Sequence, residues 1–164
     1  MVDHAMEQKK QQSKNNTITS NSYFKKNIYT NFLGFLTKDG KKKKAKLILD
    51  SAFLRVSKEL KIPTYLILIK IFLKLNCFVE TKKVRIKRST YIVPFSITFK
   101  RKSYLVIKWI MESVHEDERK LSTSEKLYFE LLSILKNKSC KTISKKDLNL
   151  SQALNNRSNI HYRW

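Results

Sequence analysis

Three stretches of this chain hold residue types that could bind phosphate groups or stack on nucleic-acid bases. One is a lysine run, one is an alternating basic segment with the helix start that follows it, and one is a C-terminal tail that mixes cations with rings. The candidate RNA-binding residues are Lys41, Lys42, Lys43, Lys44, Lys82, Lys83, Arg85, Lys87, Arg88, Lys100, Arg101, Lys102, Arg157, His161, Tyr162, Arg163 and Trp164. Cations near phosphates gain Coulomb energy and release counterions, and RNA recognition uses rings and guanidinium groups for stacking.

Each stretch also has a purely structural interpretation. The lysine run can be the solvated start of a helix, the basic segment can be the outer face of a ribbon packed on helices, and Trp164 can belong to the core. The charge balance favours binding to nucleic acid, because 35 Lys and Arg against 13 Asp and Glu give a net charge of +22. Self-repulsion of this size destabilises a compact state unless a polyanion offsets it.

Residues for catalysis or cofactor binding do not come together in the sequence. Gly34 and Gly40 are the only glycines, too few for a phosphate-cradling loop. Cys77 and Cys140 form no CxxC pair, and the three histidines lack metal-ligand spacing. The densest carboxylate group, residues 116–118, lies in a predicted loop. We therefore predict no catalytic residues, no metal and no cofactor, and hence a protein that is not an enzyme.

The elements that must position the basic residues are mostly helical. Residues 1–22 are polar and are predicted to form a disordered or extended arm, and residues 23–164 a single domain. Helices are predicted over 29–37, ending near Gly40, and from the lysine run to Leu60. Pro63 opens a third helix over 64–76, which is too short to span a bilayer and carries a solvated lysine stripe, Lys70 and Lys74.

The apolar period then changes from 3.6 to 2, which predicts a hairpin. Residues 79–88 and 91–99 alternate, with a turn near 87–90 and Pro94 at an unpaired edge. Because lone ribbons are marginal in water, a helical body or a partner must support this one. Further helices are predicted over 103–115, around a buried Trp109, after a capping box at 122–125, and from 144 onward. The predicted fold is mainly α, a bundle of about six helices with a protruding two-stranded β-ribbon between the third and fourth.

Several segments in register resemble the small-subunit ribosomal protein S7 family of bacteria and organelles. They lie within residues 27–164 and are Asn31-Phe32 through Asp39-Gly40-Lys41-Lys42, Val79-Glu80-Thr81-Lys82 through Arg85, Ser89-Thr90-Tyr91, Val93-Pro94, Lys108-Trp109-Ile110, and Asn156-Arg157 with His161-Tyr162-Arg163-Trp164. The resemblance implies a six-helix body with a protruding ribbon, and a structural role in translation. Its expected partners are the 3′ major domain of small-subunit rRNA in the subunit head, nearby mRNA and E-site tRNA, and head and platform proteins, especially of the S11 type.

The chain also departs from the family pattern. Lys87-Arg88 stands where the family usually has Gly-Gly, so the ribbon tip must turn without glycine, and Val84, Leu150 and Asn159 replace a usual arginine, histidine and phenylalanine. These departures, the A/T-rich codon bias of the composition and the lack of a transit-peptide pattern favour a mitochondrial, organelle-encoded member. The alternatives are a plastid or the cytoplasm of an A/T-rich bacterium. The rival functions are an RNA-acting enzyme, a helix-turn-helix DNA binder or another basic nucleic-acid-binding protein, and a basic membrane-surface protein.

Overall fold

The computed structural model describes residues 28–163, so the predicted arm at 1–22 and the candidate Trp164 lie outside the described residues. A helix that includes residues 28–36 comes first in the described part. The elements that follow are α2 (Lys42–Leu60), α3 (Thr64–Leu75), β1 (Val79–Ile86), β2 (Ser89–Ser96), α4 (Phe99–His115), α5 (Thr123–Leu135), α6 (Lys141–Asn155) and the 3-10 helix η1 (Arg157–Tyr162). The predicted fold class, helices with one hairpin between α3 and α4, is confirmed.

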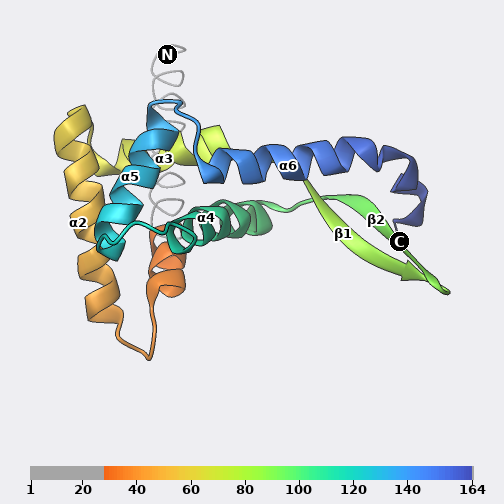
Figure 1. Ribbon diagram of the computed structural model, residues 1–164, viewed down its shortest axis with the longest axis horizontal. Coiled ribbons are helices and arrows are strands. Elements are labelled where there is room, and N and C mark those ends of the chain that lie inside the picture. The colour runs from red at the N-terminus through yellow and green to blue at the C-terminus, as the bar shows by residue number, and fades with distance from the viewer. Residues whose placement is uncertain (1–27, 164) are drawn as a thin grey trace, which may run out of the picture.

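The helices α2 to α5 form a body at one end of the molecule, and α6 and the ribbon extend away from it side by side (Figure 1). The apolar stripe predicted for α2 faces the core, where Leu49, Ala52 and Val56 are fully buried. Leu127 and Leu131 of α5 meet them from the opposite side. Burial of these aliphatic side chains supplies most of the free energy that holds the body together.

The ribbon turns at Lys87-Arg88 without a glycine, as predicted. Ile86 pairs with Ser89, and Lys87 adopts the left-handed conformation with φ of 52°. The second strand ends at Ser96, however, and α4 begins at Phe99, so the predictions of a strand to 99 and a helix from 103 were wrong. Phe99 packs against Phe72 of α3, with ring centroids 5.8 Å apart. Phe99 is therefore apolar because it packs between two helices, and not because it continues the alternation of the strand.

A second apolar cluster joins the base of the ribbon to α4. It contains Cys77, Leu105 and Trp109, with Ile97 packed against them. The predicted burial of Trp109 is confirmed.

The C-terminal segment bonds to both outer edges of the ribbon, at the base on β1 and about halfway along on β2. On β1, the Asn149 amide donates to the carbonyl of Val79 at 2.8 Å and accepts from the N–H of Thr81 at 3.4 Å. On β2, Asn159 donates to the carbonyl of Ile92 at 3.0 Å, and Arg163 donates to that of Pro94 at 3.1 Å. This is the helical support that the ribbon was predicted to need, and Pro94 lies at an outer edge as expected.

The start of α6 differs from the prediction. The helix begins at Lys141, and not near Ser144, because a tertiary contact caps it: the N–H of Thr142 donates to Glu130 Oε1 of α5 at 3.1 Å, and its hydroxyl donates to the same oxygen. The predicted capping box of α5 is confirmed, since Ser122 and Glu125 each accept from the other's backbone N–H.

Lys74 is not part of a solvated stripe. Its ammonium donates to the carbonyls of Ile134 and Leu135 at 3.1 and 2.6 Å, and so satisfies the C-terminal end of α5. Among the described residues, no helix is both long enough and apolar enough to cross a membrane.

Candidate nucleic-acid interface

The first turns of α2 and α4 each hold three cations where helix electrostatics favours acids. The first turn of α2 holds Lys42, Lys43 and Lys44, all exposed, and that of α4 holds the consecutive cations Lys100 to Lys102. Neither first turn contains an acidic residue, and neither N-cap side chain makes a capping hydrogen bond. Because the N-terminal end of a helix carries partial positive charge, these cations oppose folding and attract anions.

The start of α5 shows the opposite arrangement within the same chain. Ser122 caps it, and Glu125 in its first turn complements the helix dipole. The triple cationic starts of α2 and α4 are therefore not shared by α5. They lower the stability of both helices and place six cations at helix ends that favour anions.

The strand register divides the basic residues of the ribbon between its two faces. Lys83 and Arg85 pair with Ile92 and Thr90 and share one face, while Lys82 pairs with Val93 on the other. The C-terminal segment contacts the second face, where Tyr162 packs on Tyr91 at 4.8 Å.

The basic tip leaves its cations in solvent. Lys83, Arg85, Lys87 and Arg88 are all exposed. Within the described part of the chain, no ion pair engages any of these four. They therefore remain available to a polyanion.

Arg101, at the base of the ribbon, has a structural role that the sequence did not reveal. Its guanidinium donates to both carboxylate oxygens of Glu80 on β1, at 2.6 and 2.9 Å, and lies over the ring of Tyr104 at 4.9 Å. These bonds lower the pKa of Glu80 below its usual value. The fork joins β1 to the first turn of α4 at the base of the ribbon, and the single carboxylate in the basic strand was the signal for it.

The other cations near this base lie over rings. The ammonium of Lys102 is 3.8 Å from the ring centroid of Phe78, and that of Lys82 is 5.4 Å from the centroid of Phe95. Such contacts hold the cation close to the surface while it remains charged.

The C-terminal candidates fall into two groups. Tyr162 and Arg163 pack on the ribbon, and the Arg163 guanidinium lies over Phe95 at 5.7 Å as well as bonding to Pro94. Arg157 and His161 are exposed. The tail is thus held by the ribbon and not by the main core, and its contact with RNA stays a prediction.

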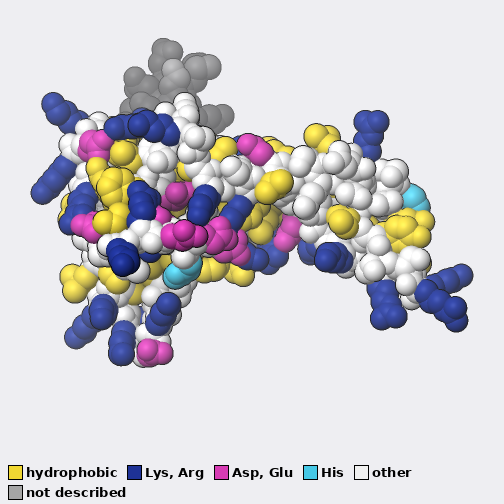
Figure 2. All heavy atoms as spheres, in the orientation of Figure 1, with side chains coloured by type: hydrophobic (Ala, Val, Ile, Leu, Met, Phe, Trp, Pro, Cys, Tyr) yellow, Lys and Arg dark blue, Asp and Glu magenta, His cyan; other side chains and the backbone are white. Residues whose placement is uncertain are grey.

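The structure does not gather the candidates into one cluster. The lysines at the start of α2 and the tip of the ribbon lie at opposite ends of the molecule (Figure 1). Figure 2 shows Lys and Arg at both ends, with Asp and Glu in the middle and also among the cations of the body. The described residues hold no group of three or more His, Cys, Asp or Glu side chains that could bind a metal ion. The arrangement suits an extended polyanion that meets the molecule at several separate points.

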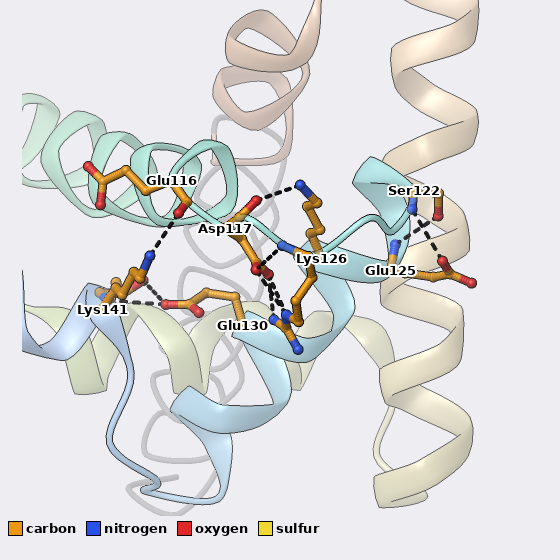
Figure 3. A network of polar contacts seen from close by, with 9 residues as sticks. Glu116, Asp117, Ser122, Glu125, Lys126, Glu130 and Lys141 are labelled. Carbon is orange, nitrogen blue, oxygen red and sulfur yellow. Dashed lines mark hydrogen bonds and ion pairs between the residues drawn. The ribbon is translucent and has the colours of Figure 1, made fainter.

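A network of polar contacts between the two ends joins α4, α5 and α6 (Figure 3). Asp117 accepts from the Arg119 guanidinium at 2.9 Å, which lowers its pKa to about 2. Lys126 donates to the backbone carbonyl of Asp117, and Lys141 donates to that of Glu116. These side chains hold the loop between α4 and α5 against the start of α6.

Comparison with known proteins shows similarity to one family. The family model described as ribosomal protein S7p/S5e matches residues 7–157. A 60-residue segment is 38% identical to the small ribosomal subunit protein uS7m of Drosophila melanogaster, and it covers 37% of this chain. The match spans only 27% of the length of that relative.

Proposed function

The chain belongs to the ribosomal protein S7p/S5e family, and on this premise we propose that it is a structural component of the small ribosomal subunit that binds rRNA. Its role is to fold and hold an rRNA domain, and not to catalyse a reaction. The name of the fruit-fly relative, a small ribosomal subunit protein, supports this proposal.

The observation that carries the proposal is the pair of cationic helix starts. Six exposed or half-exposed cations occupy the first turns of α2 and α4, at positions where they weaken the helices of the isolated protein. RNA phosphates convert this disadvantage into binding free energy, because each site combines free backbone N–H groups with side-chain charge. The exposed cations of the ribbon tip add a third point of contact.

The finer assignment follows the family resemblance. We propose that the rRNA partner is the 3′ major domain, that the protein organises the head of the subunit near the mRNA exit and the E-site tRNA, and that its neighbours include an S11-type protein. The proposed location is the mitochondrion, which the suffix in the relative's name uS7m supports.

A salt titration of RNA binding tests the proposal. The protein should bind a transcript of the 3′ major domain with an affinity that falls by roughly 10³–10⁵ between 50 and 200 mM salt, on the scale for about 6–10 neutralised phosphates in DNA complexes. A nearly flat response, or equal affinity for an unrelated structured RNA across the whole titration, would contradict it.

A further inference from the structure

We propose that the groove between the first described helix and the start of α4 binds one unstacked base of the RNA, with Tyr104 as its stacking surface. This inference rests on the proposed function and assigns a site within it. The groove has a volume of about 770 Å³ and lies apart from both the lysine run and the ribbon tip.

Two small residues line the groove and leave space in it. Gly34 on the first helix and Ser103 on α4 both line it, and no atom lies within 4 Å of where a Cβ of residue 34 would stand. Gly34 is helical, so the backbone conformation does not require glycine here. A glycine inside a helix costs about 1 kcal/mol relative to alanine. The effect of glycine at position 34 is therefore to leave space in the groove that a side chain would fill.

Aromatic rings form the walls. Phe35, Phe99 and Tyr104 line the groove, and Phe99 and Tyr104 keep 53% and 39% of their surface exposed. The Tyr104 ring contacts Phe35 at 5.1 Å and carries the Arg101 guanidinium on it at 4.9 Å. A base stacks on such a ring whatever its identity, because every base presents a π-face.

The rim supplies the groups that a nucleotide needs besides a ring. Lys100 lines the groove from the cationic, uncapped first turn of α4, and Asn31 lines it from the opposite helix with an amide. A phosphate next to the stacked base would meet the N-terminal end of α4 and the ammonium of Lys100. This charge selects a nucleotide over an apolar peptide as the occupant.

Phe129 provides a matched control ring. It is 38% exposed, carries the Arg119 guanidinium at 5.0 Å, and contacts a neighbouring ring, Tyr128, at 5.1 Å. The Arg119 that lies over it, however, is bound to the carboxylate of Asp117. Tyr104→Leu and Phe129→Leu therefore remove equivalent rings from different sites.

The test measures the affinity of the full chain for a transcript of the 3′ major domain of the cognate small-subunit rRNA at several salt concentrations. Tyr104→Leu should weaken binding by about 5- to 150-fold, the range for loss of one base–aromatic stack, with no change in the slope against salt. Phe129→Leu should leave both the affinity and the slope unchanged. Gly34→Leu fills the groove and should weaken binding while it raises the melting temperature, because leucine favours the helix.

Crosslinking locates the contact. Ultraviolet irradiation of the complex followed by trypsin should place a nucleotide on peptide 103–108, in which Tyr104 is the sole ring. The proposal is overturned if Tyr104→Leu binds RNA as tightly as Phe129→Leu does. That result is expected if a protein or another segment of this chain fills the groove. The proposal is also overturned if the Tyr104→Leu variant loses affinity together with a lower salt slope. If the unaltered chain does not bind rRNA, both the proposed function and the groove proposal fail. If the unaltered chain binds rRNA but the Tyr104→Leu variant gives either refuting result, only the groove proposal is rejected.

Discussion

Neutralising the cationic start of α2 should change stability and RNA affinity in opposite directions. In the variant Lys42→Gln, Lys43→Gln, Lys44→Gln, three charges leave the positive end of the helix dipole, and glutamine has nearly the same helix propensity as lysine. Each charge opposes the dipole by a few tenths of a kcal/mol, so the gain is about 1 kcal/mol in total. For a domain of this size that raises the melting temperature by roughly 2–4 °C.

The same variant should bind rRNA more weakly. If all three lysines contact phosphates, the slope of log affinity against log salt falls by about 2–3, since each neutralised phosphate contributes about 0.7–0.9. Thermal melting followed by circular dichroism and filter binding over a salt series measure both effects on one protein preparation.

The control removes the same charge from elsewhere. Lys58, Lys120 and Lys138 are exposed, and Lys58 lies in the last turn of α2, where a cation suits the dipole. Replacing these three with glutamine should not raise the melting temperature and should change the salt slope less. A control slope that falls as much as that of the α2 variant would show that binding follows net charge alone. A lower melting temperature of the α2 variant would refute the argument from the dipole.

Three further predictions concern the supports of the ribbon and α6. Glu80→Gln should lower the free energy of unfolding at pH 7 by about 1 kcal/mol. Because Arg101 lowers the pKa of Glu80 in the folded state, this contribution is present above the usual pKa of 4.5 and is lost as the pH falls from there through the lowered pKa. Melting curves of variant and parent should therefore converge under acid conditions, and a constant gap would argue against the ion pair. Asn159→Ala should speed hydrogen exchange of the β2 amides while the melting temperature of the body stays nearly constant, since one exposed-edge bond contributes about 0.5–1.5 kcal/mol; unchanged exchange would show that the edge is held in another way. Thr142→Val should destabilise the protein by about 1–3 kcal/mol in denaturant titrations, because Glu130 loses the hydroxyl donor and stays partly buried. The variant keeps the backbone N–H bond to Glu130, so a neutral effect would show that the hydroxyl adds nothing to the cap of α6.

Much of the fold was predictable because local signals agreed with the packing. The α2 stripe and the Ser122 capping box describe periodic or short-range patterns, and both hold in the structure. The alternation from residue 79 onward predicted the ribbon for the same reason. Local patterns fix an element whenever the tertiary contacts demand the same conformation.

The remaining features depend on contacts between distant parts of the chain. Glu130 sets the start of α6 from 12 residues away, and Lys74 meets the end of α5 across 60 residues. Asn159, which departs from the family pattern, bonds to the backbone of β2 across 67 residues. Composition and charge runs selected the basic candidates, and of these all but Lys102 are exposed in the described residues. It did not show that Arg101 and Arg163 also hold the ribbon, because an arginine bound to a carboxylate or a carbonyl looks the same in sequence as one that faces RNA.

Sedimentation followed by RNA crosslinking tests the central claim most directly. The tagged full-length chain should migrate with the small ribosomal subunit through a gradient and remain there after a high-salt wash, and crosslinks should map to the starts of α2 and α4 and to the ribbon tip. The proposed function would be contradicted if the chain left the subunit in the wash. It would also be contradicted if the crosslinks fell on the carboxylate-bearing face around Asp117 and not on the cationic sites.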